Sequence, residues 1–216
     1  MRNEDLIRYY DQRAQEYDTV YLKPEWQLGL GHIEMFLKMS FFNCEVFEVA
    51  CGTGFWTEKI SLTSKSVHAA DANESVIQIA RKRCAKRNNV KFEVSDFFSM
   101  DSFDLVDGVF GGFIWSHIDL VSLDSFLSKV HNMIKPGGKV IFLDTNYLKG
   151  HNRPITETDA AGNTYQKRDL LDGSTHLVLK NFPSAEDITL RLSNISTDLI
   201  VQDLKYFWMA SYKVKP

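Results

Sequence analysis

The sequence predicts an α/β fold, with a doubly wound and mostly parallel sheet that carries helices on both faces. Apolar runs of strand length recur along the chain, and stretches with helical periodicity separate them. Strands that alternate with helices build parallel sheets covered on both faces. The strands are expected at about 45–50, 66–71, 90–95, 104–110 and 139–144.

Helices are expected before the first strand and between the strands. The first covers Glu4 to Tyr17, and the second covers Trp26 to Met39. Three more are expected at about 57–63, 74–87 and 122–134, the last with Ser122 as its N-cap.

The pattern changes after residue 144. Residues 164–182 predict a hairpin inserted before the final helix, because Asp172-Gly173 supplies the positive backbone angles of a tight turn. The final helix begins near Ser184, and strands at about 198–205 and 207–214 follow. The polar segment 150–162 is either a mobile lid or a surface loop.

Composition limits the class of protein. The chain has 216 residues, of which 44% are apolar, so one domain over 1–216 is expected. The net charge of -3 and the lack of a long basic block disfavour nucleic acid as a partner. No apolar run reaches the length of a membrane span or a secretion signal, so we expect a cytoplasmic protein without a membrane partner, as a monomer or homodimer. Three cysteines without C-x-x-C spacing predict structural thiols and no metal site.

A glycine turn follows the first strand and is the most informative segment. The strand Val46 to Val49 runs into Ala50-Cys51-Gly52-Thr53-Gly54, and acidic residues follow at the expected ends of the next two strands. Glycines let a backbone approach a ligand closely, and an acid at the next strand end can hold a ribose diol. The third glycine of the dinucleotide fingerprint and the Lys-Ser/Thr pair of a P-loop are both missing. The pattern therefore predicts a different adenosine-containing cofactor.

These motifs, in this order, resemble the class I S-adenosylmethionine-dependent methyltransferases. Glu48, Gly52 and Gly54 fall on the first motif of that family, and Lys135-Pro136-Gly137-Gly138 is similar to its approach to the fifth strand. The resemblance implies a Rossmann-like sheet of seven strands with the last antiparallel, and N-terminal helices within 1–40 that cap the cofactor. It implies S-adenosyl-L-methionine as cofactor and S-adenosyl-L-homocysteine as product.

The resemblance also implies roles for individual residues. Glu48 orients the methionine moiety, Gly52 and Gly54 admit the cofactor, Asp71 holds the ribose, and Asp96 with Phe97 holds the adenine. The full set of expected cofactor-binding residues is Tyr10, Tyr17, Glu48, Ala50, Gly52, Gly54, Trp56, Asp71, Ala72, Asp96, Phe97 and Gly112.

His117 is the candidate catalytic base, because the loop after the fourth strand faces the transferred methyl group in this family and histidine titrates near neutrality. Its alternative role is to bond the backbone or order the cofactor. The candidate substrate contacts are Arg13, Trp115, Ser116, His117, Asp144 and Tyr147. Arg168 and Lys180 of the hairpin either meet an acidic substrate or stay solvated.

The predicted activity is methyl transfer to an oxygen or nitrogen atom of a small metabolite. The chain lacks the Asn-Pro-Pro-Tyr or Asp-Pro-Pro-Tyr run typical of many enzymes that methylate nucleobases. A catalytically silent, methyltransferase-like protein that binds the cofactor and regulates a partner is the alternative, because its cofactor motifs would look the same.

Overall fold

The computed structural model describes residues 4–100, 104–170 and 173–215. Within these residues the helices and strands alternate as the sequence predicts, and no helix has the length and apolar character needed to cross a bilayer. The helices are α1 (Glu4–Arg13), α2 (Gln27–Ser40), α3 (Phe55–Ile60), α4 (Glu74–Arg83), α5 (Leu123–His131) and α6 (Ala185–Ser193). The strands are β1 (Glu45–Val49), β2 (Ser66–Asp71), β3 (Val90–Val94), β4 (Val106–Gly112), β5 (Ile134–Thr145), β6 (Glu157–Thr158), β7 (Thr164–Asp169), β8 (Thr175–Leu179), β9 (Ser196–Asp203) and β10 (Phe207–Val214).

The main sheet has seven strands in the order β3-β2-β1-β4-β5-β10-β9. β1 to β5 pair in parallel, whereas β10 is antiparallel to both of its neighbours. This confirms the predicted doubly wound sheet with its last strand antiparallel. The order reverses at β1, and in such sheets ligands bind beyond the carboxyl ends of the strands at this switch point.

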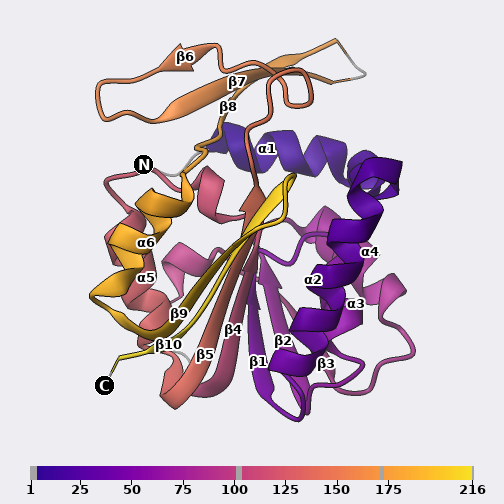
Figure 1. Ribbon diagram of the computed structural model, residues 1–216. Coiled ribbons are helices and arrows are strands. Elements are labelled where there is room, and N and C mark those ends of the chain that lie inside the picture. The colour runs from indigo at the N-terminus through magenta and orange to yellow at the C-terminus, as the bar shows by residue number, and fades with distance from the viewer. Residues whose placement is uncertain (1–3, 101–103, 171–172, 216) are drawn as a thin grey trace.

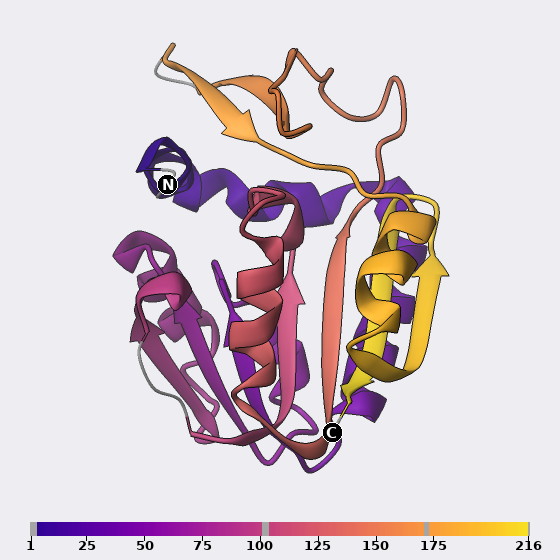
Figure 2. The same ribbon diagram turned by 90° about the vertical axis from the view of Figure 1, so that its left-hand side faces the viewer.

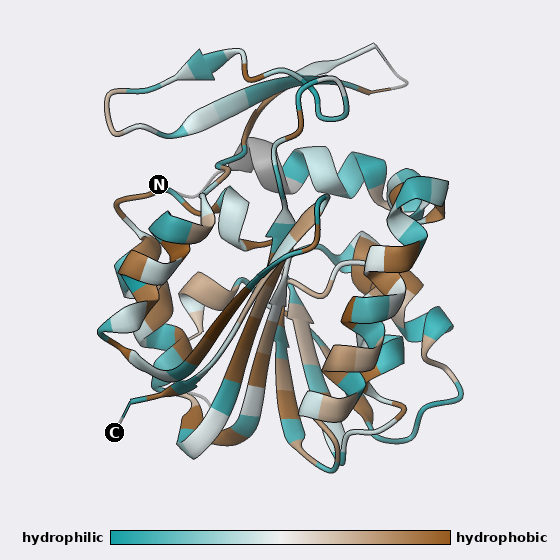
Figure 3. Cartoon of the chain, in the orientation of Figure 1, coloured by the Kyte–Doolittle hydropathy of each residue, from teal (hydrophilic) through white to brown (hydrophobic). Residues whose placement is uncertain are grey.

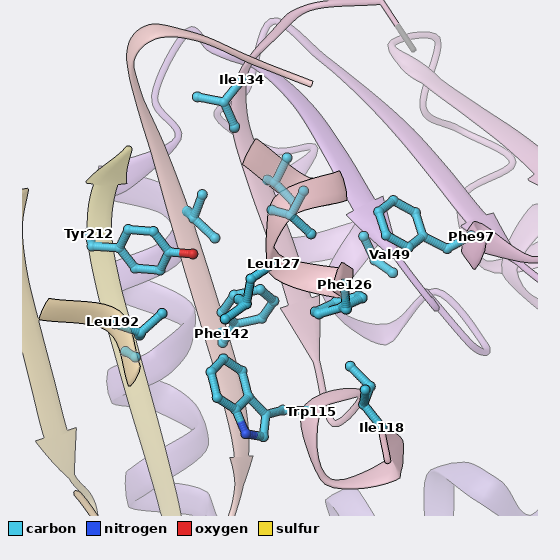
Figure 4. Close-up of a cluster of buried hydrophobic side chains, with 14 of the residues drawn as sticks. Val49, Phe97, Trp115, Ile118, Phe126, Leu127, Ile134, Phe142, Leu192 and Tyr212 are labelled. Atoms are coloured by element: carbon cyan, nitrogen blue, oxygen red, sulfur yellow. The ribbon is translucent and has the colours of Figure 1, made fainter. Parts of the chain in front are cut away.

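Helices cover both faces of the sheet, as Figure 1 shows. On one face α5 and α6 pack against side chains such as Phe142 and Tyr212, and on the other α2, α3 and α4 pack against Phe110 and Ile141. Figure 4 shows part of the first cluster, with Phe126 and Trp115 beside Phe142. Neighbouring residues of a strand point to opposite faces, so each central strand serves both clusters.

A second, smaller sheet lies above the main one. β6, β7 and β8 pair antiparallel in that order, and together with α1 they cover the end of the main sheet at which β1 to β5 finish (Figures 1 and 2). Figure 3 shows that this small sheet is mostly hydrophilic, whereas apolar residues gather on the main sheet. The predicted hairpin is confirmed, with Gly173 at φ +83°. Asp172 of its turn lies outside the described residues.

The segment 150–162, expected as a lid or a surface loop, contributes the third strand of the small sheet. β6 pairs through Glu157 with Tyr165 and through Thr158 with Thr164. The segment is therefore partly held by a strand ladder.

Several element boundaries differ from the prediction. The first helix ends at Arg13, four residues early, and 3-10 turns continue over Ala14–Leu22. Asp18 in these turns pairs with Arg83 and accepts a hydrogen bond from Thr53, so contacts with distant elements set the backbone here. The helix predicted over 74–87 ends at Arg83, and β5 begins at Ile134, before the predicted residue 139. In the pairing of β4 with β5, Val106 lies opposite Ile134 and Gly108 opposite Lys139. This shift of register accommodates Gly137 and Gly138 of β5.

Candidate active site

Two cavities lie at the carboxyl ends of the parallel strands, beneath α1 and the small sheet. The large cavity has a volume of about 1030 Å³ and the small cavity about 180 Å³. Tyr10, Tyr17, Phe113 and His117 line both of them. We call these four residues the shared wall, because they line both cavities.

The large cavity is lined by the residues that end or follow four neighbouring strands. Ala50 and Gly52 follow β1, Asp71 ends β2, Asp96 follows β3, and Gly112 ends β4. Ala72 and Phe97 line it as well. The structure thus brings together nine of the twelve residues expected to bind the cofactor, including Tyr10 and Tyr17 of the shared wall.

Gly52 and Gly54 have different structural roles. Both have left-handed backbones, with φ of +54° and +76°. A Cβ atom added to Gly52, which lines the large cavity, would meet no protein atom within 4 Å. A Cβ atom added to Gly54 would lie 2.9 Å from the Cβ atom of Ala80 in α4. Gly54 does not line the cavity, so the expectation that it admits the cofactor is corrected: it lets the start of α3 pack against α4.

Asp71 fastens the glycine turn to the end of β2. One carboxylate oxygen accepts the backbone N–H of Gly52 and the other accepts that of Asn73, both at 2.9 Å. Burial raises the pKa of Asp71, and the bonds from backbone N–H groups oppose that rise. The carboxylate oxygens have further lone pairs, so this arrangement leaves acceptor capacity toward the cavity.

Asp96 and Phe97 sit together after β3. The Asp96 carboxylate accepts the backbone N–H of Phe98 at 3.0 Å, which fixes the start of a short 3-10 turn. The Phe97 ring packs edge-on against Phe126 of α5, with ring centroids 5.5 Å apart. An acid beside a held aromatic ring is suited to a planar heterocycle with an exocyclic amine.

Glu48 and Trp56 lie behind the glycine turn and outside both cavities. Glu48 is buried, and its carboxyl group accepts a hydrogen bond from the Thr57 hydroxyl at 2.6 Å. Burial raises the pKa of Glu48 to about 8. Trp56 packs between Tyr21 and Phe110 in the core. The expected direct contact of these two residues with a cofactor is corrected. Glu48 bonds to Thr57 of α3, and Trp56, which belongs to α3, packs into the core between α3 and the sheet.

His117 is held at both ring nitrogens. Its Nδ1 donates to the Leu179 carbonyl at 2.6 Å, because a carbonyl oxygen can only accept. Its Nε2 therefore accepts the hydrogen bond from the Tyr10 hydroxyl at 2.8 Å. Burial, together with the positive charges of Lys180 and Arg168, holds the pKa of His117 well below its ordinary value. His117 is a neutral ring that joins α1 to β8.

The expected substrate contacts are divided between the small cavity and the core. Arg13 lines the small cavity, as His117 does. Asp144 is fully buried and receives the Lys180 ammonium at 2.8 Å and the backbone N–H of Ser116 at 2.9 Å. Lys180 also donates to the Ser116 hydroxyl at 2.5 Å. Ser116 and Asp144 therefore lie behind Lys180 and position it, rather than lining the cavity themselves.

Trp115 and Tyr147 line neither cavity, although Tyr147 packs against Phe182, which lines the small one. Trp115 is 3% exposed and packs edge-on against Phe142 and Trp208 (Figure 4). Tyr147 is 39% exposed and packs against Phe182. The expectation that Trp115 contacts substrate is corrected, because the short 3-10 turn over Trp115–His117 directs Trp115 into the core and His117 to the cavities. A substrate contact of Tyr147 stays a prediction.

Arg168 and Lys180 belong to the small cavity and are not solvated. They are 8% and 6% exposed. Gln166, on the same face of β7 as Arg168, and Phe113, with φ +61°, line the small cavity too and were not expected. The alternation of Gln166 and Arg168 along the strand was the available signal for a shared inner face.

The chain is similar in sequence to methyltransferases. A family model described as a methyltransferase domain matches residues 46–138. An uncharacterized methyltransferase of Bacillus mycoides (strain KBAB4) is 25% identical over 142 residues, which make up 63% of this chain and 65% of that protein. A demethylmenaquinone methyltransferase of Tropheryma whipplei (strain Twist) is 27% identical over 114 residues, 51% of this chain and 46% of that protein. The chain thus spans less than two thirds of these curated relatives.

A solved structure is similar over nearly the whole chain. The complex of DhpI with SAH superposes with a TM-score of 0.83 at 26% identity, and the match covers 99% of this chain and 97% of that chain. The similarity includes the small sheet and α1, which lie outside the segment matched by the family model.

Proposed function

We propose that this chain, which belongs to the class I S-adenosylmethionine-dependent methyltransferases, transfers a methyl group to an oxygen or nitrogen atom of a small metabolite. One observation carries the proposal: the large cavity lies at the switch point of the sheet, with an unhindered glycine backbone at Gly52 and acids at the ends of two neighbouring strands. The similarity to a methyltransferase family and to a structure solved with SAH supports it.

The residues that line the large cavity fit S-adenosylmethionine. The volume of this cavity, about 1030 Å³, is at the upper end of ordinary ligand sites, roughly 300–1,000 Å³. In this proposal Asp71 accepts from the ribose hydroxyls, and Asp96 accepts from the adenine amine beside the Phe97 ring. Gly52 and Ala50 allow close approach of the backbone. When bound, the cofactor supplies an activated methyl group on a sulfonium centre.

Glu48 would act on the cofactor from a distance. Its buried carboxyl lies directly behind the turn, and burial keeps it largely protonated near neutral pH. A positive charge placed beside the turn would favour its ionised form. Glu48 is thus proposed to stabilise the amino end of the methionine moiety through the turn, without contact.

The shared wall would orient the two substrates. Tyr10 and Tyr17 come from the N-terminal segment, and Phe113 and His117 come from the loop after β4. Correct alignment alone can lower the barrier of such a reaction by as much as ~7–11 kcal/mol. His117 is proposed to position Tyr10, since both of its nitrogens are occupied.

A small acceptor is favoured over a macromolecule. The small cavity has a volume of about 180 Å³, and residues of α1 and of β7 in the small sheet line it. A polymer would have to displace this cover to reach the shared wall. We expect a cytoplasmic enzyme, as a monomer or homodimer, without nucleic acid or membrane partners.

Calorimetric titration with S-adenosylmethionine and S-adenosylhomocysteine tests the proposal, followed by a screen of metabolite extracts for release of S-adenosylhomocysteine. Binding with turnover is the expected result. Binding without turnover in any extract would favour the silent regulatory protein, and failure to bind either compound would refute the assignment of the large cavity.

A further inference from the structure

The small cavity is positively charged in a way that methyl transfer alone does not require. Its lining includes the cations Arg13, Lys23, Arg153, Arg168 and Lys180. None of the described residues that line it is acidic. The net charge of the whole chain is -3, so this concentration of cations is local.

Arg168 contributes a buried positive charge that has no counter-charge among the described residues. The residue is 8% exposed, and its guanidinium donates to the Gln166 side chain at 3.0 Å and to the Tyr10 hydroxyl at 3.4 Å. Among the described residues it makes no ion pair, and its buried Nε has no hydrogen-bond partner. Burial raises the pKa of Tyr10, so this phenol is neutral. An unpaired buried charge is costly, which makes the site favourable for an anion.

The neighbouring cations differ in how far they are compensated. Lys180 pairs with the buried Asp144, so only part of its charge acts on the cavity. Arg13 donates to the Tyr9 hydroxyl at 3.2 Å and lies near the Tyr17 ring. Neither hydroxyl nor ring neutralises a guanidinium. Two guanidinium groups with neutral partners therefore line the same cavity, and planar guanidinium groups match the geometry of carboxylates and phosphates.

The position of Arg168 places an anion beside the shared wall. Its guanidinium contacts Tyr10, which lines both cavities and bonds to His117. His117 offers no free lone pair to remove a proton from an acceptor, because Nε2 is occupied by Tyr10 and Nδ1 carries the hydrogen that bonds Leu179. An acceptor that is already an anion needs no such base.

We propose that the small cavity binds the methyl acceptor as a small organic acid, held through its oxyanion by Arg168 with Arg13, and that an oxygen of this oxyanion receives the methyl group. This rests on the proposed function. The bond between sulfur and the methyl carbon breaks, sulfur keeps the electron pair, and a new oxygen–carbon bond forms. A carboxylate gives a neutral ester and a phosphonate dianion gives a monoanionic ester, and no proton is moved. Carboxylates and phosphonates share this chemistry.

Binding of anions to the protein saturated with S-adenosylhomocysteine tests the proposal by calorimetry. The probes are phenylphosphonate and methylphosphonate in one arm, and benzoate and acetate in the other, with benzamide as a neutral control. At least one arm is expected to bind saturably, and the arm that binds identifies the acid. Arg168→Met should weaken that binding at least about thirtyfold, as loss of one partner of a buried charge pair does.

Lys167→Met is the matched control, because Lys167 is the neighbouring residue on β7, is exposed and lines neither cavity. It should leave anion binding unchanged. Arg168→Lys, which keeps the charge, should retain more binding than Arg168→Met. Each variant is first shown to bind S-adenosylhomocysteine, which separates this test from that of the proposed function. Failure of both arms, or equal binding by Arg168→Met, in protein that still binds S-adenosylhomocysteine would overturn the proposal.

The proton balance tests the acceptor atom. With S-adenosylmethionine and the acid that binds, the reaction in weak buffer, at a pH well above the second ionisation of a phosphonate, should release no proton per turnover. Mass spectrometry should find the methyl group on the acid oxygen. Release of one proton per turnover would identify a hydroxyl or amine acceptor and overturn this part of the proposal.

Discussion

Substituting alanine for Gly52 and for Gly54 should separate ligand binding from folding. Both positions have positive φ, so each alanine costs about 1–2 kcal/mol of backbone strain. At Gly54 the new Cβ would lie 2.9 Å from Ala80, and overpacking of this kind adds about 1–3 kcal/mol. At Gly52 the new methyl group meets no protein atom within 4 Å, so no such term is added.

Gly54→Ala should therefore lose more stability, and Gly52→Ala should lose more affinity for the cofactor. A free-energy difference of 1 kcal/mol shifts the melting temperature by roughly 2–4 °C in a domain of this size, so Gly54→Ala should melt about 2–12 °C below Gly52→Ala. The added methyl of Gly52→Ala occupies space in the large cavity, and we expect the affinity for S-adenosylhomocysteine to fall at least about tenfold, or ~1.4 kcal/mol. Gly54→Ala should bind within about threefold of the native protein, less than ~0.7 kcal/mol.

Thermal melting and calorimetric titration of both variants measure these differences. Ala80→Gly in the Gly54→Ala background should restore the packing part of the loss, less the ~1 kcal/mol that glycine costs within a helix. The pair should thus show a coupling energy of about 1 kcal/mol or more. Equal losses of affinity in the two variants, or no coupling with Ala80, would refute the separation of roles.

Four further substitutions test other parts of the site. Asp71→Ala should weaken cofactor binding well over tenfold, since loss of a buried partner charge costs ~2–5 kcal/mol, and unchanged affinity by calorimetry would contradict the ribose assignment. The pKa of Glu48 is raised from 4.5 to about 8, so its contribution to the stability of the ligand-free fold falls as the pH rises from 4.5 toward 8. In urea unfolding, the stability of Glu48→Gln relative to the native protein should therefore increase over this range. A constant difference would argue against a buried protonated carboxyl. Because the pKa of His117 is depressed, the stability of the fold should decrease as the pH drops below about 6.5, where only the unfolded state gains the proton. In urea unfolding, His117→Asn should reduce this acid dependence. An unaltered dependence would count against the neutral ring. Trp115→Ala should cost about 3–5 kcal/mol of stability with cofactor affinity unchanged, and a matching loss of affinity would return Trp115 to the site.

The sheet and the large cavity were predictable because their signals are local. Each strand end and its following turn are adjacent in sequence, and the parallel topology brings those ends to one edge. Asp71 and Asp96 could therefore be placed at the cavity without a structure. The strand boundaries deviate mainly at β5, where pairing with β4 takes in residues before the glycines.

The roles of neighbouring side chains were less predictable, because they depend on distant packing. The role of Gly54 is decided by Ala80, which lies on another helix. Trp115 and His117 are two residues apart, yet one enters the core and the other the cavities. Arg168 looks like a solvated hairpin cation in the sequence, yet its side chain is buried against Tyr9 and Tyr10 of α1.

The small sheet is joined to the rest of the protein near its ends and through its packing on α1. Asn163 accepts the backbone N–H of Leu120, and Asn181 donates to the Ile118 carbonyl, while Lys180 reaches Asp144. The described residues between these contacts, 164–170 and 173–179, supply Gln166 and Arg168 but no strand of the main sheet. In the acceptor site proposed above, part of the lining therefore comes from a segment that adds no strand to the main sheet. Libraries confined to Gln166 and Arg168 would vary acceptor contacts while leaving the main sheet unchanged.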